Sequence, residues 1–433
     1  MDARALAALA ANPGCRRRAL LDGAGIDKGA LASALGAPAN FGQSQFAHQR
    51  GNSFEARVKA DGGADLVRLL HERLRDGSEP PGPGAVATPD LTAPGPQGRT
   101  ARTALALREA TEAGRWALLD HPMVSLDVAG SPAFLEPDAV VVHPDGSWTV
   151  VEIKSFPMVD GSADPAKVGA AARQSAVYTL ALERVASMIG RPPEDGGGAA
   201  GAVDAVDAAE TASGAKSAEA AAGTPETAGP AGAVAAVAAV APAGTAAREG
   251  LVAPAGAASV RARVRHHVLL VCPKDFSNLP TAEMVDVRKQ LAVTRRQLDR
   301  LTRIEEIAAA LPEGTTFDLR FTDDGRTPTR PVEELTAAVE AVDAAYAPEC
   351  LSTCELAAHC RTRSRTAGRV EALGRGVRSE LGGLTTMDAV LTAAMERPAD
   401  DAPTGDPTVD ALRRAAALRA EALASRPEAV ACR

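Results

Sequence analysis

Apolar and polar residues follow helical spacing over the first quarter of the chain. Residues 2–35 are expected to be helical with a break at Asn12-Pro13-Gly14, because proline and glycine end helices. A second helical stretch is expected over residues 43–74, where apolar side chains recur on one face. Residues 103–119 predict a further helix, or a helix followed by a strand. Helices are therefore expected to precede the sheet.

The middle of the chain has the pattern of a β-hairpin. Residues 139–142 are a short apolar run, residues 143–146 have turn composition, and residues 147–156 are rich in β-branched side chains. Residues 167–188 then predict a helix. Further strands are expected over residues 264–271 and 316–321, and further helices over residues 282–311, 331–347 and 370–423. This order predicts an α/β fold, with a mixed-sheet core flanked by helices.

Composition divides the chain further. Residues 77–99 are rich in proline and glycine, and residues 196–260 are mainly alanine and glycine with no aromatic residue. Such a tract buries too little apolar surface to offset the entropy lost on ordering, so we interpret it as an insertion. The expected segments are a helical N-terminal part (1–76), a linker (77–99), the core (100–195), the insertion (196–260), the rest of the core with a cysteine cluster (261–366), and a helical C-terminal extension (367–433).

Charge and hydropathy limit the classes of function. Lysine and arginine number 47 against 55 aspartate and glutamate residues, so the formal net charge is −8. This balance excludes a protein that coats nucleic acid by charge alone. It allows an enzyme that meets phosphate through a divalent ion, because the ion then supplies the local positive charge. No apolar run is long enough to span a bilayer and the N-terminus lacks a signal-peptide pattern, so we expect a cytoplasmic protein without a membrane partner.

Three charged residues flank the predicted hairpin. Asp138 begins the first arm, and Glu152 and Lys154 share one face of the second arm because side chains alternate along a strand. Two carboxylates on adjacent strands suit Mg²⁺ or Mn²⁺, and a lysine beside them can orient or deprotonate water. This combination is typical of phosphodiester hydrolysis. The alternative is an exposed hairpin on which Glu152 and Lys154 form an ordinary ion pair.

Two further pairs accompany this group. His48 and Glu55 are seven residues apart, which places two residues of metal-ligand type on one face of a helix. Gln174 and Tyr178 are four residues apart on the helix after the lysine, and an amide and a phenol suit the holding of a base or phosphate. His48 alone is equally compatible with a surface histidine, and Tyr178 with a core tyrosine.

Taken in order, these residues resemble the RecB-type branch of the PD-(D/E)xK nucleases, over about residues 43–190. The resemblance implies a restriction-endonuclease-like core in which His48, Asp138 and Glu152 bind the metal together with the Ile153 carbonyl. It implies that Lys154 is the catalytic lysine and that Glu55 is a supporting catalytic acid. It further implies that Gln174 and Tyr178 contact DNA or order the site.

The cysteines suggest a second metal centre. Cys350, Cys354 and Cys360 have ligand-like spacing, whereas zinc and iron–sulphur centres take a fourth ligand. Cys15 is the best candidate for it because it follows the Pro-Gly break ahead of His48. The layout is similar to that of iron–sulphur RecB-like nucleases, the AddB-type and CRISPR-associated exonucleases, although their first gap is one residue shorter. A 4Fe–4S cluster, a zinc site and plain buried thiols remain open.

These observations predict a metal-dependent deoxyribonuclease, acting as an exonuclease on DNA ends or single strands in repair, recombination or defence. The alternatives are a non-catalytic DNA-binding or adaptor subunit that keeps the fold, and an RNA-directed nuclease. No ATP-binding phosphate-loop motif occurs in the chain, so any helicase activity would come from a partner subunit.

Overall fold

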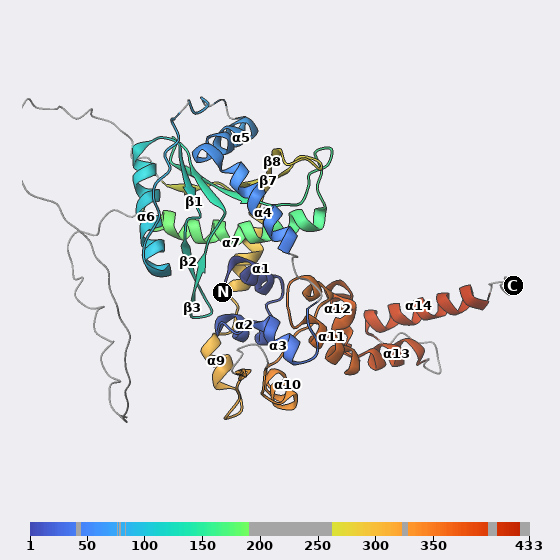
Figure 1. Ribbon diagram of the computed structural model, residues 1–433. Coiled ribbons are helices and arrows are strands. Elements are labelled where there is room, and N and C mark those ends of the chain that lie inside the picture. Colours follow the sequence, from blue (N-terminus) through green and yellow to red (C-terminus); the bar gives the residue numbers. More distant parts are fainter. Residues whose placement is uncertain are drawn as a thin grey trace, which may run out of the picture. The chain divides into compact units, whose positions relative to one another are not determined.

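The computed structural model contains a mixed sheet of six strands, with helices packed around it (Figure 1). The structure describes residues 1–39, 45–75, 77, 79–82, 84–189, 262–322, 328–396 and 405–424, without the side chains of residues 45–48 and 375. The predicted insertion over residues 196–260 lies outside these residues. Residues 1–190 and 259–433 form one compact unit, so the predicted segments on either side of the insertion belong together.

The strands of the sheet come from two separated parts of the chain. In spatial order they are β1 (Ala117–Asp120), β4 (Ala139–Val142), β5 (Ser147–Ile153), β7 (His267–Pro273) and β8 (Pro280–Asp286), with the short β6 (Arg263–Val264) beside the start of β5. Strands β5 and β7 are parallel, and the other neighbours along this order are antiparallel. The predicted mixed α/β core is thus confirmed.

The predicted hairpin is present as β4 and β5, paired from Ala139 opposite Val151 to Val142 opposite Trp148. Alternate residues of these strands belong to two different apolar clusters. Val140 and Val150 belong to one, whereas Val141 and Val151 belong to the other. Both faces of the hairpin are therefore buried, which explains why its arms are nearly continuous apolar runs.

Helices cover both faces of the sheet. One face packs against α4 (Gln45–Val58) and α5 (Ala64–Leu74), whose Phe54, Val58 and Leu66 are buried against the strands. The other face packs against α1 (Ala3–Ala11), α6 (Gly95–Ala113), α7 (Pro165–Ile189) and α8 (Arg288–Leu298). The helix predicted over residues 167–188 is confirmed as α7, which crosses the sheet in Figure 1.

A separate hairpin, β2 (Val124–Val128) with β3 (Ser131–Leu135), forms a two-stranded sheet that the sequence did not predict. Its alternate residues Val124, Leu126 and Val128 are buried in the same apolar cluster as α7. Residues 121–138 therefore reach from the end of β1 to the start of β4 by way of this hairpin. The connection brings His121 and Asp138 next to each other, where the His121 amide donates to the Asp138 carbonyl at 3.3 Å.

The remaining helices surround a third apolar cluster built from the two ends of the chain. It contains residues of α2 (Arg16–Gly23), α3 (Lys28–Ala34), α10 (Val332–Glu340) and the segment leading into α11 (Ala357–Thr366). A short helix, η2 (Pro348–Ser352), precedes α11, and four helical segments follow it: η3 (Val370–Leu373), α12 (Arg375–Glu380), α13 (Met387–Met395) and α14 (Pro407–Ala424). Helix α9 (Ile304–Ala309) contacts α2. The short helix η1 (Ala60–Gly63) links α4 to α5.

Several predicted boundaries were wrong. The long helix expected over residues 282–311 is β8, α8 and α9, because residues 280–286 pair with β7 along its whole length. The strand expected over residues 316–321 is reduced to a single bridge from Phe321 to Pro328. Helix α6 begins at Gly95, inside the predicted linker, and the helix expected over residues 370–423 is broken into several shorter ones.

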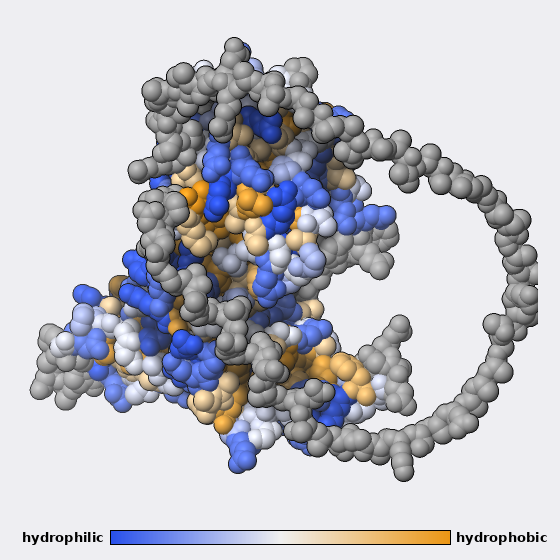
Figure 2. Space-filling view, turned by 90° about the vertical axis from the view of Figure 1, so that its left-hand side faces the viewer, coloured by the Kyte–Doolittle hydropathy of each residue, from blue (hydrophilic) through white to orange (hydrophobic). Residues whose placement is uncertain are grey.

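The distribution of hydrophobic side chains on the surface can be followed in the space-filling view (Figure 2). The face drawn in Figure 2 carries mostly hydrophilic side chains, with hydrophobic ones in smaller groups between them. Among the described residues, no helix has both the length and the apolar character needed to cross a membrane.

Candidate active site

Asp138 and Glu152 meet where β4 begins and β5 ends. Because Ala139 pairs with Val151, the residue before Ala139 comes opposite Glu152 on the neighbouring strand. The Asp138 carboxylate accepts a hydrogen bond of 2.6 Å from the Ile153 amide. This bond ties the loop before β4 to the end of β5, so the two predicted carboxylates lie at one edge of the sheet.

Glu152 is fully buried, with none of its surface exposed. Its carboxylate forms an ion pair with the Lys154 ammonium and accepts a hydrogen bond of 3.3 Å from the Ser175 hydroxyl of α7. Burial raises the pKa of Glu152, Lys154 opposes that shift, and the nearby Asp138 carboxylate adds to it. The predicted common face of Glu152 and Lys154 is confirmed, and it is an enclosed one rather than an exposed strand face.

The pKa values of Asp138 and Lys154 are also shifted, and each of these residues affects the other. Burial raises the pKa of Asp138, although Lys154 and the Ile153 amide favour its charged form. Burial on its own would lower the pKa of Lys154, but the carboxylates of Glu152 and Asp138 raise it overall. Two carboxylates thus share one ammonium group, so the group as a whole attracts a further cation.

Gln174 and Tyr178 lie on the face of α7 that approaches this group. The Gln174 amide donates to the Tyr178 hydroxyl at 3.0 Å, and that hydroxyl donates to the Glu136 carbonyl at 3.1 Å. Burial raises the pKa of Tyr178, and the charges of Glu152 and Asp138 raise it further. The phenol is therefore neutral, and with Gln174 it braces the segment that carries Asp138.

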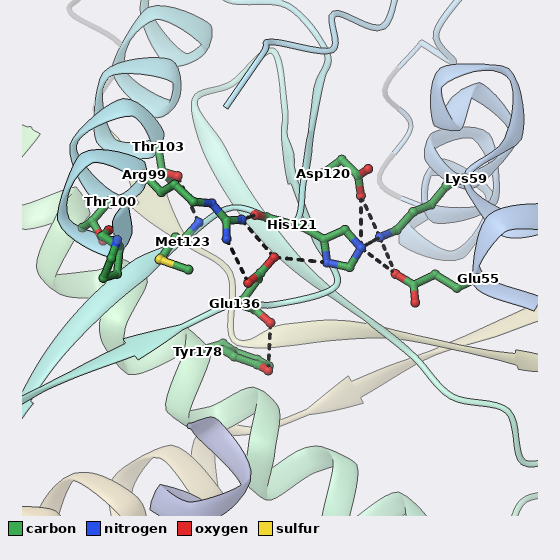
Figure 3. A network of polar contacts seen from close by, with 11 residues as sticks. Glu55, Lys59, Arg99, Thr100, Thr103, Asp120, His121, Met123, Glu136 and Tyr178 are labelled. Carbon is green, nitrogen blue, oxygen red and sulfur yellow. Dashed lines mark hydrogen bonds and ion pairs between the residues drawn. The ribbon is translucent and has the colours of Figure 1, made fainter. Parts of the chain in front are cut away.

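Glu55 belongs to a polar network that it forms with Lys59, Asp120 and His121 (Figure 3). Its Oε1 atom lies 2.6 Å from the Lys59 Nζ atom and 3.0 Å from the His121 Nε2 atom. Lys59 also pairs with Asp120 at 2.6 Å. The hydrogen bond with His121 is the main cause that lowers the pKa of Glu55 to about 2, assisted by Lys59.

The network continues from His121 to the loop before Asp138 (Figure 3). Arg99 donates to both carboxylate oxygens of Glu136, at 2.9 and 3.2 Å, and to the His121 carbonyl at 3.0 Å. The hydrogen bond with Glu55 raises the pKa of His121 against the effect of burial. Arg99, Asp120 and His121 also line a cavity of about 390 Å³. A half-exposed histidine and an arginine therefore border an opening next to the predicted site.

The predicted metal ligands are brought together only in part. His48 lies on α4, but its side chain is outside the described residues, and for Ile153 the structure shows the amide bonded to Asp138. Among the described side chains, no group of three or more histidine, cysteine, aspartate or glutamate residues is arranged to hold a metal ion. The described part of the site therefore offers two carboxylates, Asp138 and Glu152, to a cation.

The segments that carry the four predicted cysteine ligands are in contact, although 335 residues of sequence separate Cys15 from Cys350: the Asn12 amide donates to the Cys350 sulphur at 3.6 Å, and the Arg17 guanidinium donates to the Cys360 sulphur at 3.2 Å. Burial is the main cause that raises the pKa of Cys350, of Cys354 (to about 12) and of Cys360, and the charge of Cys15 contributes to each shift. Cys15 and Cys354 are buried, and the other two are partly buried. Cys272, interpreted as a core residue, is fully buried at the end of β7.

Sequence reasoning missed several members of the site. Lys59 could have been found, because it lies one helical turn after Glu55. Ser175 could also have been suspected, because it lies three residues before Tyr178 and so on the same side of the helix. His121 could not, because its position depends on the pairing of β1 with β4 and on the unpredicted β2–β3 hairpin between them.

No protein-family model, curated protein or solved structure matches the chain. The function therefore has to be inferred from the residues themselves.

Proposed function

We propose that this protein is a metal-dependent deoxyribonuclease with a RecB-like, restriction-endonuclease-like core. The observation that carries the proposal is the joining of Asp138, Glu152 and Lys154 at one edge of a mixed sheet flanked by helices. A structural ion pair would need only one carboxylate, whereas this group holds two carboxylates around one lysine in a buried setting. That surplus of negative charge suits a hard divalent cation.

Asp138 and Glu152 would hold Mg²⁺ or Mn²⁺, with His48 and the Ile153 carbonyl as the further predicted ligands. When bound, the ion supplies Lewis acidity toward a phosphodiester oxygen and acidity to a coordinated water. The burial that raises the pKa of both carboxyl groups fits such a site, because a bound cation favours their charged forms and so offsets the cost of burying them.

The chain's own residues would divide the remaining work. Lys154, held by Glu152, presents its ammonium group to the attacking water or to the charge that develops on the phosphate. Ser175 holds the second oxygen of Glu152, so the carboxylate keeps one orientation. Tyr178 and Gln174 fix the backbone just before Asp138, and Glu55 with Lys59 and His121 fixes the end of β1. These contacts preorganise the site.

DNA binding has separate support at the other end of the sheet. A cavity of about 970 Å³ opens beside the start of β5 and β7. Its lining includes Arg73, Arg263, Arg265 and Arg288, with Asp145 among them. Asp145 pairs with both Arg263 and Arg265, at 2.5 and 3.3 Å. Arginines in excess over acids suit the phosphodiester backbone.

Cys15, Cys350, Cys354 and Cys360 are proposed to hold a 4Fe–4S cluster, with zinc as the alternative. Their thiols form a soft donor set of the kind that both centres use. Cys354 is buried beside the partly buried Cys350 and Cys360 in one apolar cluster, so these thiols are shielded from water as such a centre requires. The centre would then link the N-terminal helices to the segment that follows α10.

Cleavage of linear DNA by the Lys154→Met variant tests the proposal. With Mn²⁺ or Mg²⁺, wild-type protein is expected to degrade end-labelled DNA, and the variant is expected to be slower by at least about a hundredfold, because it loses a charge that acts in the transition state. The variant should still fold, because Glu152 can bind a proton when its partner is lost.

The matched control is Lys289→Met, which removes an exposed lysine of α8 and is expected to cleave at the wild-type rate. Normal cleavage by Lys154→Met would exclude the mechanism. Wild-type protein that binds DNA equally well with a chelator and shows no turnover would favour the adaptor alternative, and cleavage of RNA alone would favour an RNA-directed nuclease.

A further inference from the structure

Arg17 is a buried arginine at the cysteine cluster. Only 7% of its surface is exposed. Its guanidinium donates from Nε to the Val342 carbonyl at 3.2 Å and from Nη1 to the Cys360 sulphur at 3.2 Å. Its own amide donates to the Asp343 carbonyl at 2.8 Å, so the backbone holds the residue in place. The side chain therefore reaches the cysteine sulphur from a fixed position.

The cations around Arg17 have carboxylate partners. Arg18 pairs with Asp22 at 3.0 Å, and Lys28 pairs with Asp22 and, at 3.6 Å, with Glu355. Arg17 forms no ion pair with any carboxylate of the described residues; its partners are a carbonyl and a sulphur. A buried cation without a counter-charge is costly, and an arginine cannot relieve the cost by losing its proton.

The cysteines can supply the missing charge only in one state. Neutral thiols carry no charge, whereas a metal centre binds cysteine as thiolate. Four thiolates around Zn²⁺, or around a 4Fe–4S core in its usual 2+ state, give a centre of charge −2. Asn12 adds a second donor, because its Nδ2 atom lies 3.6 Å from the Cys350 sulphur and 2.6 Å from the Ala345 carbonyl.

We propose that Arg17 is the built-in counter-ion of an anionic four-thiolate centre on Cys15, Cys350, Cys354 and Cys360. The inference rests on the metal centre proposed above and assigns Arg17 as its positioning residue. In the loaded protein Arg17 holds the Cys360 thiolate by a charge-assisted hydrogen bond. In the metal-free protein the same residue is an uncompensated buried charge, so it makes the loaded state more favourable relative to the empty one.

The test compares full-length wild-type protein with Arg17→Met, which keeps much of the stem and removes the charge. Zn²⁺ affinity is measured by competition with a chelator, and iron–sulphur loading by anaerobic reconstitution and absorption near 400 nm, an approximate position for such clusters. Arg17→Met is expected to bind Zn²⁺ about 10- to 100-fold more weakly. The increase in Tm on loading should also be smaller, because the empty form is relieved and the loaded form weakened.

Two further variants separate charge from packing. Arg16→Met removes the preceding arginine of α2, which is exposed and pairs with Asp343 at 3.7 Å, and should leave affinity and Tm unchanged. Arg17→Lys keeps the positive charge, so it should bind Zn²⁺ at least about tenfold more tightly than Arg17→Met.

The possible results distinguish a failure of the proposed metal centre from a failure of the proposed role of Arg17. If wild-type protein takes up no metal on these cysteines, the centre itself is excluded and the counter-ion role with it. If wild-type protein binds metal and Arg17→Met binds it equally well, with the same rise in Tm, only the role of Arg17 is overturned. An empty Arg17→Met protein that is less stable than empty wild type, or a failed rescue by lysine, would also contradict it.

Discussion

At the residue scale, the central feature is a carboxylate placed where water cannot reach it. Glu152 is enclosed by β5 and α7, and its partners are the Lys154 ammonium and the Ser175 hydroxyl. Removing a charged group from water is costly, so such a residue favours its protonated form unless a cation is close. The Lys154 ammonium favours the charged form of Glu152, whereas the charge of Asp138 opposes it. A divalent ion would satisfy both carboxylates together.

This arrangement predicts a pH-dependent response to metal. The raised pKa of Glu152 means that the metal-free fold is stabilised at pH values below the ordinary glutamate pKa and loses that stabilisation as the pH rises through the folded value. Metal binding has the opposite dependence, because the ion must displace the proton. The increase in Tm caused by Mn²⁺ should therefore grow between about pH 5 and about pH 8.

Thermal unfolding with and without Mn²⁺ at several pH values measures this effect. Glu55 does not disturb this measurement. Its pKa is lowered to about 2, so its contribution to the stability of the fold is nearly constant over this pH range. A metal-induced increase in Tm that stays the same or falls as the pH rises would contradict the proposed site.

At the scale of elements, the start of α5 packs closely against the sheet. Gly63 precedes α5 with φ of +73°, and a Cβ atom placed there would lie 2.0 Å from a methyl carbon of the buried Leu118. Gly62 also has a positive φ, of +67°, but its nearest neighbour, a Thr88 methyl carbon, would be 3.7 Å away. Substituting Gly62 therefore tests the backbone strain alone, whereas substituting Gly63 tests that strain together with the close contact to Leu118.

Gly63→Ala is expected to lower the free energy of unfolding by about 2–4 kcal/mol, the sum of a left-handed backbone and an overpacked contact. Gly62→Ala should cost about 1–2 kcal/mol, from the backbone alone. Urea unfolding of the two full-length variants measures the difference. Equal losses would show that α5 does not pack against Leu118 as described.

The elements also show what the sequence could predict. The β4–β5 hairpin and α7 were predicted correctly because each has an unambiguous local pattern, an apolar run with turn residues in one case and a long helical period in the other. Strand β8 was mistaken for helix because residues 280–286 run directly into the helical pattern of α8, and only pairing with β7 makes them a strand.

At the scale of the whole molecule, both proposed centres join distant parts of the chain. Asp138 and Glu152 were predictable as neighbours because one hairpin carries both, whereas His121 reaches the site only through the packing of other elements. The grouping of Cys15 with Cys350, Cys354 and Cys360 is implied by the family resemblance, and the contacts of Asn12 with Cys350 and of Arg17 with Cys360 bring the two segments together. Their buried arginine partner has no sequence signal, because Arg17 lies between two other arginines and only the fold distinguishes them.

The most direct test of the central claim is the rate at which full-length protein degrades end-labelled linear DNA with Mn²⁺, compared between wild type and Glu152→Gln. This substitution keeps the size of the side chain and removes only its charge. The account predicts cleavage by wild-type protein that a chelator abolishes, and a rate for Glu152→Gln that is lower by at least about a hundredfold although the variant remains folded. A folded Glu152→Gln protein that cleaves DNA at the wild-type rate would contradict the account.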